Sequence, residues 1–195
     1  RDQNLVVLGL AEAATSEEYA KWHAADQGAT AFPTARDPAG KEFNSGISAV
    51  DYGAGMLPGV AVIGADAKLV GGTIGMGPKI PGIVHTLLAR AGIKLKAGDR
   101  PAMIAAVRIQ PHPASSGPAE AKVALLTAGQ AAPDFVSITA DGKEVKPSDY
   151  RGKILVLDFW ATWCGPCMAS MPHTQATAAH YQDQGVAVLA SCTSD

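Results

Sequence analysis

The chain has 195 residues, of which 47% are hydrophobic and 17% charged, and its formal net charge at pH 7 is −2. This length suits one globular domain with appended segments. Mixed charges without a basic run argue against nucleic acid as a partner, and no apolar stretch approaches the roughly 20 residues that cross a bilayer. Because the first residue is Arg1, we expect a processed chain or a fragment, so a missing signal peptide carries no information about compartment.

The N-terminal part of the chain predicts α/β structure. Residues 5–10 (LVVLGL) form a continuous apolar run that is typical of a buried strand, and residues 15–18 (TSEE) are a capping pattern that begins a helix. Residues 59–75 contain two apolar strands around a turn at residues 65–68. A helix is then expected over residues 80–91.

A change in composition predicts a linker at residues 96–129. This segment is rich in proline and glycine, with Pro111 and Pro113 close together, and both residue types interrupt helices and strands. The chain is therefore expected to divide into residues 1–95, the linker, and residues 130–195.

The C-terminal part again alternates strands and helix. Residues 136–145 predict a hairpin that turns at the Asp-Gly dipeptide of residues 141–142. A buried strand is expected over residues 154–159, a helix over 166–184 and a last strand over 186–190.

Two cysteines stand where this helix should begin. One sulfur of a Cys-Gly-Pro-Cys sequence, Cys164, would lie at the positive end of the helix dipole, which stabilises a thiolate. The other, Cys167, would be close enough to form a disulfide, so the pair predicts thiol–disulfide exchange. The alternative is half of a zinc site, which needs two more ligands. The third cysteine, Cys192, and the five histidines supply no pair at zinc spacing, and no metal site is predicted.

The residues around the cysteines resemble the active-site segment of thioredoxin. Residues 158–167 read DFWATWCGPC, with Asp158 six residues before the first cysteine, tryptophans at 160 and 163, and Pro172 five residues after the second. The wider segment, from the Ala-Pro-Asp-Phe of residues 132–135 onward, resembles the opening of a redoxin domain. Such domains occur in the extracytoplasmic TlpA-like thiol–disulfide oxidoreductases.

The resemblance implies a thioredoxin-like fold, but the elements after residue 195 that would complete it are missing. Residues 3–93 resemble the back half of the same fold: strand, helix, cis-proline, two strands and helix. Residues 3–8 also align with residues 184–189, at an offset of 181. The expected fold class is therefore α/β, a thioredoxin-like mixed sheet flanked by helices, with its halves in permuted order or belonging to two tandem domains. In a permuted sheet, one of the two repeated strands should be displaced or lie at an edge.

The resemblance assigns three catalytic roles. Cys164 is the attacking thiolate and Cys167 resolves the mixed disulfide. Asp158, as in thioredoxin, would accept the proton of Cys167 through water, and burial in an apolar strand should raise its pKa. The alternative for Asp158 is a carboxylate at a strand end that reaches solvent.

Four further residues are expected to contact substrate. Trp163 would shield the cysteine pair, and Gly165 and Pro166 shape the first helical turn, whereas Trp160 is expected in the core. Pro58 is a candidate cis-proline that would offer backbone groups to an extended substrate. The alternative for Pro58 is an ordinary trans loop proline.

The leading functional hypothesis is a thiol–disulfide oxidoreductase, favoured as a reductase because the resemblance links a Gly-Pro pair with reducing potentials. Its expected partners are protein or small-molecule disulfides and a redox donor protein, with no cofactor, and a domain-swapped homo-oligomer is allowed. The resemblance implies an extracytoplasmic location and leaves the cytoplasm open. The alternatives are a peroxiredoxin-type thiol peroxidase and a non-catalytic thioredoxin-like binding module.

Overall fold

The computed structural model describes residues 7–12, 17, 20, 21, 24, 34–38, 51, 52, 57–74, 79–99, 126–139 and 141–194. The helix expected after residue 15 is helical at its four described positions, and its other residues lie outside the described part. Most of the predicted linker also lies outside the described part. Among the described residues, no helix is both long enough and apolar enough to cross a membrane.

The described elements form one mixed sheet with helices, so the α/β class is confirmed. The sheet order is β4-β3-β7-β1-β8-β2-β5-β6, and β7 also pairs with β8 and β1 with β2. The elements in chain order are β1 (Val7–Glu12), β2 (Thr34–Asp37), β3 (Gly59–Ile63), β4 (Leu69–Ile74), α3 (Ile80–Arg90), β5 (Ser137–Thr139), β6 (Glu144–Val145), the 3-10 helix η2 (Pro147–Tyr150), β7 (Ile154–Ala161), α4 (Gly165–Tyr181), the 3-10 helix η3 (Gln182–Gln184) and β8 (Val186–Ser194).

Strand β7 joins the two parts of the chain. It runs antiparallel to β3, from Gly59 opposite Phe159 to Ile63 opposite Leu155, and parallel to β8 along its whole length. All eight residues of β7 are buried. Because both faces are covered, its sequence is an almost continuous apolar run instead of an alternation of apolar and polar residues.

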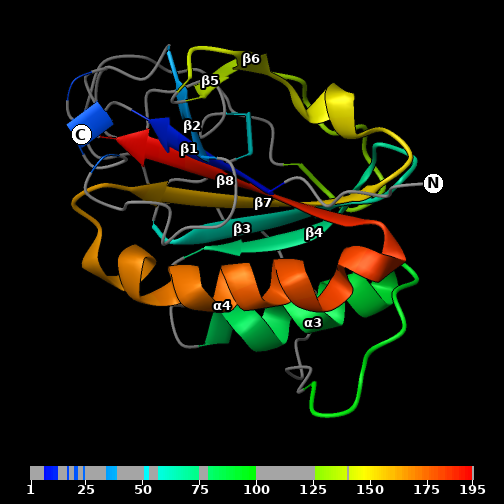
Figure 1. Cartoon of the computed structure of the whole chain (residues 1–195). Helices are drawn as coiled ribbons and strands as arrows, with labels where there is room; N and C mark the ends of the chain where they lie inside the picture. The colour runs from blue at the N-terminus through cyan, green and yellow to red at the C-terminus, as the bar shows by residue number, and fades with distance from the viewer. Residues whose placement is uncertain are drawn as a thin grey trace.

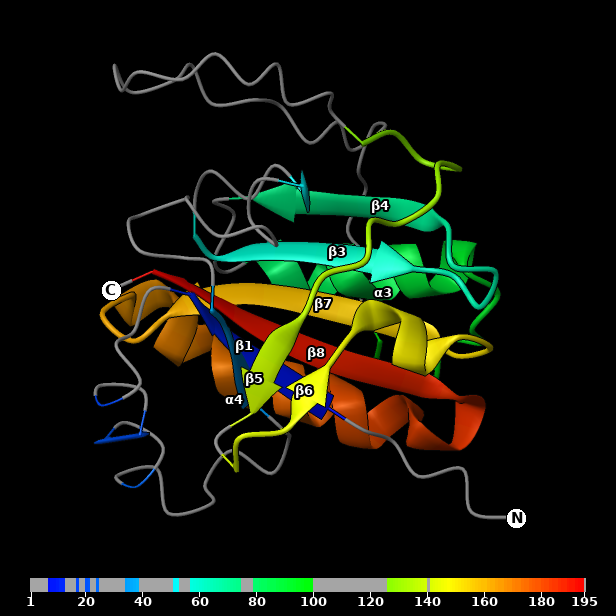
Figure 2. The same cartoon turned by 90° about the horizontal axis from the view of Figure 1, so that it is seen from above.

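The two faces of the sheet have different cover. Helices α3 and α4 lie together on one face, and the β5–β6 hairpin and η2 lie over the other (Figures 1 and 2). Side chains of β7 alternate between the two cores, as the period of a strand requires. Val156 and Trp160 pack with the helices, whereas Leu155 and Leu157 pack with the hairpin side.

Strands β1 and β8 are the two copies of the repeated sequence, and they lie side by side. They pair in parallel, with Val7 opposite Val188 and Leu8 opposite Leu189, which is the offset of the repeat. The expectation that one copy would be displaced or lie at an edge is wrong, because the sheet ends at β4 and β6. The parallel ladder thus accommodates both apolar strands in the interior of the sheet.

Most element boundaries agree with those expected. The hairpin turns at Gly142, whose φ of 81° is in the left-handed region that favours glycine. Helix α4 ends three residues before the expected position, and η3 completes the stretch to Gln184. The last strand is longer than expected and reaches Ser194.

Polar contacts tie the segment after α3 to the end of α4. Asp99 accepts hydrogen bonds from the Tyr181 hydroxyl and from the backbone N–H of Lys96, and Lys96 Nζ lies 2.9 Å from Asp183 Oδ1. Burial acts to raise the pKa of Asp99, but these hydrogen bonds, together with the nearby His85 and His180, hold the pKa below its usual value. The two helices are therefore joined at this end as well as through the core.

Helix α3 packs closely on the sheet. Leu87 is fully buried, and a Cβ atom on Gly71 of β4 would stand 2.8 Å from Leu87 Cδ2. The same core cluster contains Leu87, Trp160 and both cysteines of the Cys-Gly-Pro-Cys sequence. The core around the cysteines thus includes residues from both parts of the chain.

We expect Leu87→Ala to lower the free energy of unfolding by about 2–5 kcal/mol, the range for removing a buried leucine side chain. Urea unfolding followed by far-ultraviolet circular dichroism and by tryptophan fluorescence should show one transition at a lower urea concentration. Arg90→Ala, an exposed change in the same helix, should alter stability by less than about 0.5 kcal/mol. A loss below about 1 kcal/mol for Leu87→Ala would contradict this packing.

Candidate functional site

The cysteine pair lies where α4 begins. Cys164 has an extended backbone (φ −78°, ψ 91°) and caps the helix: its Sγ accepts a hydrogen bond from the Cys167 N–H at 3.3 Å. Pro166 stands in the first turn, where a helix has no use for the missing N–H. The predicted start of the helix at these cysteines is thus confirmed.

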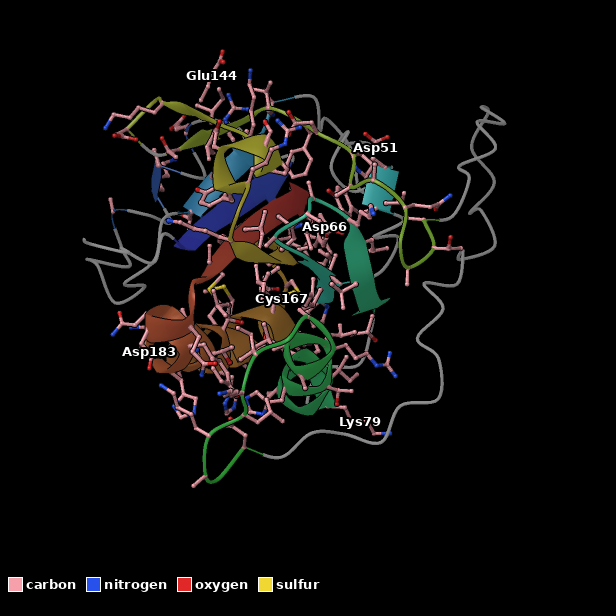
Figure 3. The ribbon with its side chains drawn as sticks, turned by 90° about the vertical axis from the view of Figure 1, so that its right-hand side faces the viewer. Asp51, Asp66, Lys79, Glu144, Cys167 and Asp183 are labelled. Carbon is pink, nitrogen blue, oxygen red and sulfur yellow. A yellow bond between two sulfur atoms is a disulfide. The ribbon has the colours of Figure 1, made fainter. Side chains whose placement is uncertain are left out.

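Cys164 and Cys167 form a disulfide. The S–S distance is 2.00 Å and the two Cα atoms are 5.2 Å apart. Both residues are buried, Cys164 at 4% and Cys167 at 1% exposure, whereas Gly165 and Pro166 between them are exposed. Figure 3 places Cys167 between α4 and the sheet. An approaching molecule therefore meets first the exposed Gly-Pro turn that separates the two buried cysteines.

The two tryptophans of the motif have different environments. Trp160 is 1% exposed and belongs to the core on the helix side, as predicted. Trp163, directly before Cys164, is 53% exposed, and within the described part of the chain Val136 is the other large hydrophobic residue at the surface. An indole at the surface beside the disulfide suits contact with a substrate, and that role for Trp163 stays a prediction.

Asp158 occupies a position on β7 that faces the helices, between Val156 and Trp160. Its exposure is only 3%, so the alternative of a carboxylate that reaches solvent is wrong. Burial raises the pKa of Asp158 to about 7, although a hydrogen bond from Thr174 acts in the opposite direction. Thr174 Oγ1 donates this bond to Asp158 Oδ2 at 2.7 Å. Near neutral pH the carboxyl can therefore both accept and release a proton.

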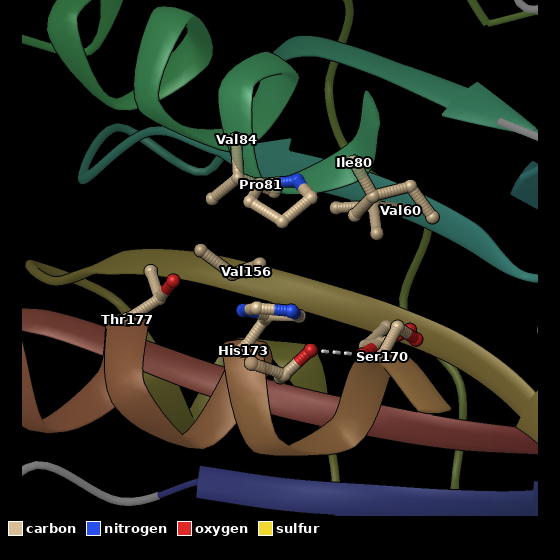
Figure 4. Close-up of a pocket in the computed structure, with 10 residues that line it drawn as sticks. Val60, Ile80, Pro81, Val84, Val156, Ser170, His173 and Thr177 are labelled. Atoms are coloured by element: carbon tan, nitrogen blue, oxygen red, sulfur yellow. Dashed lines mark hydrogen bonds between the residues drawn. The ribbon is translucent and has the colours of Figure 1, made fainter. Parts of the chain in front are cut away.

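A small cavity adjoins the carboxyl of Asp158. Figure 4 shows Ile80, Pro81 and Val84 of α3 with Val60 of β3 on one side, and Ser170, His173 and Thr177 of α4 on the other. Its volume of about 10 Å³ is close to what one water molecule needs. At the end of α4 nearest the disulfide, the Ser170 hydroxyl donates to the backbone carbonyl of Cys167 at 2.8 Å. The cavity thus begins one helical turn beyond the second cysteine.

Pro58 precedes β3, and its bond to Leu57 is cis, as predicted. Gly59, the next residue, pairs with Phe159 of β7, five positions before Cys164. Leu57 packs against the core cluster that contains both cysteines. The structure thus brings the Leu57–Pro58 segment to the strand that leads into the cysteine motif, and contact of Pro58 with a substrate stays a prediction.

Thr174 is a site residue that the sequence reasoning missed. It lies seven positions after Cys167, so the helical period places both residues on the same face of α4. The signal available in the sequence was a polar residue on the face of the helix that covers the buried carboxylate of Asp158. The described residues contain no group of three or more His, Cys, Asp or Glu side chains arranged to hold a metal ion.

A helix-capping disulfide beside a buried carboxyl, on a mixed α/β sheet, is an arrangement suited to redox-active thiol proteins. The family model described as Redoxin matches residues 127–195. This match confirms the resemblance predicted for residues 130–195 and implies a thioredoxin-like fold for that segment. The matched segment starts at residue 127, so the resemblance of residues 3–93 stays a prediction.

Curated relatives agree with this family. The chain is 48% identical over 62 residues to the "Thiol-disulfide oxidoreductase ResA" of Geobacillus thermodenitrificans, covering 32% of this chain and 36% of that protein. It is 47% identical over 66 residues to the protein of the same description from Oceanobacillus iheyensis, covering 32% and 34%. The chain thus spans about a third of the length of these relatives. No solved structure gave a significant match.

Proposed function

We propose that this protein is a thiol–disulfide oxidoreductase that exchanges disulfides through Cys164 and Cys167 and works as a reductase. One observation carries the proposal: the two sulfurs are bonded to each other at the N-terminus of α4, one of them capping the helix. The positive end of a helix stabilises the thiolate that exchange requires. The description of the ResA relatives as thiol–disulfide oxidoreductases supports the same reaction class.

The reaction would begin from the dithiol. The Cys164 thiolate attacks one sulfur of a substrate disulfide, a new S–S bond forms, and the other substrate sulfur leaves as a thiolate that takes a proton from solvent. Cys167 then gives its proton to Asp158 through water, and its thiolate attacks Cys164 Sγ. This step releases the second substrate thiolate and closes the Cys164–Cys167 disulfide. Two electrons pass from the protein to the substrate, and a separate donor must return them.

We propose protein disulfides as the substrates and a redox protein as the donor, in an extracytoplasmic compartment. Trp163 supports a large substrate, because its exposed ring extends the apolar surface beside the disulfide. The extracytoplasmic assignment rests on the resemblance to TlpA-like proteins.

We further propose that residues 57–90 and 127–195 together complete one thioredoxin-like sheet, with its halves in permuted order. The antiparallel pairing of β3 with β7 supports this arrangement, and so does the shared core of α3, α4 and the cysteines. The Leu87→Ala variant described above also tests it. If the two halves form one unit, Leu87→Ala in α3 should destabilise the structure around Cys164 as well as α3 itself.

Reduction of insulin by the protein, with dithiothreitol as electron source, tests the proposed function. We expect turnover well above the rate with dithiothreitol alone, and a negligible rate when hydrogen peroxide replaces insulin. Peroxide turnover without insulin reduction would favour the thiol peroxidase. If the protein accelerates neither reaction, the oxidoreductase proposal fails and a non-catalytic binding module remains.

A further inference from the structure

Thr174 uses its hydroxyl in an uncommon way for a threonine within a helix. Such hydroxyls usually bond back to a carbonyl of their own helix, as Thr86 of α3 does to the Gly82 carbonyl at 3.0 Å. The Thr174 hydroxyl instead crosses to the sheet and donates to Asp158 Oδ2 at 2.7 Å. The helix thus directs a donor to the buried carboxyl, one heptad beyond Cys167.

This hydrogen bond involves one oxygen of the carboxylate and leaves the other for a proton. A hydroxyl that donates to Oδ2 stabilises the charged form of Asp158 and fixes the rotation of its carboxyl group. Besides Thr174, three polar side chains of α4 line the cavity beside Asp158: Ser170, His173 and Thr177. The other lining residues are apolar. In such surroundings, one donor can change the proton affinity of the carboxyl strongly.

We propose that Thr174 is a positioning residue, which holds the Asp158 carboxylate by Oδ2 so that Oδ1 takes the proton of Cys167 when the mixed disulfide is resolved. This inference rests on the proposed function. In the step, the proton moves from Cys167 Sγ through water to Asp158, and the electron pair left on sulfur forms the bond to Cys164 Sγ. The bond between Cys164 and the substrate breaks, and the substrate sulfur leaves with its electron pair. Asp158 afterwards returns its proton to solvent.

The balance of forces on Asp158 agrees with this role. Burial raises the pKa of Asp158 to about 7, and the hydrogen bond from Thr174 keeps it from rising further. Without that bond the pKa would be higher, so a smaller fraction of the carboxyl would be ionised at neutral pH and able to accept the proton of Cys167. Thr174 would thus keep Asp158 in the range where it accepts and releases protons.

Three variants of α4 test the inference. Thr174→Val removes the hydroxyl at nearly constant volume, and Thr174→Ser restores it. Thr177→Val is the matched control, because Thr177 lines the same cavity one turn further along the helix. Near-ultraviolet circular dichroism verifies that each variant is folded.

The first measurement is the titration of the Asp158 carboxyl carbon by NMR in the oxidised protein, where Cys164 and Cys167 do not titrate. The Asp158 signal is identified as the carboxyl resonance that is absent from the spectrum of Asp158→Asn. We expect the midpoint to rise by about one pH unit in Thr174→Val, and to stay near the wild-type value in Thr174→Ser and Thr177→Val. An unchanged midpoint in Thr174→Val, or an equal rise in Thr177→Val, would overturn the inference.

The second measurement is the pH dependence of insulin reduction. For a rise of one pH unit from a midpoint near 7, the ionised fraction at pH 7 falls from about a half to about a tenth. Reduction by Thr174→Val should therefore be roughly fivefold slower at pH 7 and should approach the wild-type rate at pH 9. A loss of the same size at every pH would indicate a merely structural role and would overturn the inference.

The two measurements separate this inference from the proposed function. If the wild type reduces no disulfide but the Asp158 midpoint still rises in Thr174→Val, the proposed function is overturned. The effect of Thr174 on the protonation of Asp158 then still stands. An active wild type with an unchanged midpoint in Thr174→Val overturns the coupling alone.

Discussion

Cys167→Ser will stop turnover and leave the protein joined to its substrate through Cys164. The reason is that the attack by Cys164 does not need Cys167, whereas release of the substrate does. Cys164→Ser should abolish turnover without forming the joined species. Both single changes should therefore reduce the rate to that of dithiothreitol alone.

Non-reducing gel electrophoresis and mass spectrometry after mixing each variant with oxidised insulin would detect the joined species. Cys192→Ser is the control, since it removes the third cysteine of the chain and should remain active. A substrate joined to Cys164→Ser but not to Cys167→Ser would reverse the two assignments. Activity in Cys164→Ser would show that the exchange does not pass through the helix-capping sulfur.

Asp158→Asn will make the oxidised protein more stable at alkaline pH. Folding raises the pKa of Asp158 from 3.8 to about 7, chiefly through burial. Below pH 4 the group is protonated in both states and contributes no difference. Between pH 4 and 7 the unfolded chain releases the proton more readily, so the free energy of unfolding falls as the pH rises. Above pH 7 the full cost is present, about 4 kcal/mol for this pKa difference.

Urea unfolding of wild type and Asp158→Asn at pH 4 and pH 8 measures this effect. The two proteins should differ little at pH 4, and the variant should gain about 4 kcal/mol relative to the wild type at pH 8. Asp66→Asn, at an exposed carboxylate that pairs with Lys68 at 3.5 Å, should show no comparable change between the two pH values. Equal pH dependence in wild type and Asp158→Asn would contradict the buried, raised carboxyl.

Local patterns predicted most of the elements near the site. The apolar run of β7 and the Asp-Gly turn of the hairpin are signals carried by a few neighbouring residues, and the structure agrees with both. The helix start at Cys164 was predictable for the same reason, because a capping position and a proline in the first turn are local features. The element order of residues 59–90 also followed from local periodicity.

Contacts between distant segments were harder to predict. The hydrogen bond from Thr174 to Asp158 joins a helix to a strand, and its existence depends on how α4 lies on the sheet. The place of β1 was missed because a continuous apolar strand fits an interior position as well as an edge, and pairing alone decides between them. Burial of Asp158 was one of two alternatives, since the local sequence does not say whether a residue near the end of a strand reaches solvent.

The short span of the disulfide has a consequence for the coupling between oxidation and folding. Cys164 and Cys167 are separated by three positions, so the cross-link closes a very small loop. By the loop-closure model, such a link reduces the entropy of the unfolded chain by an amount worth about 2 kcal/mol, against about 4.7 kcal/mol for a loop of 100 residues. The two apolar cores, and not this bond, therefore dominate the stability. Under the proposed function, the bond can therefore open and close in each reaction cycle while the domain stays folded, which is the opposite of a structural disulfide.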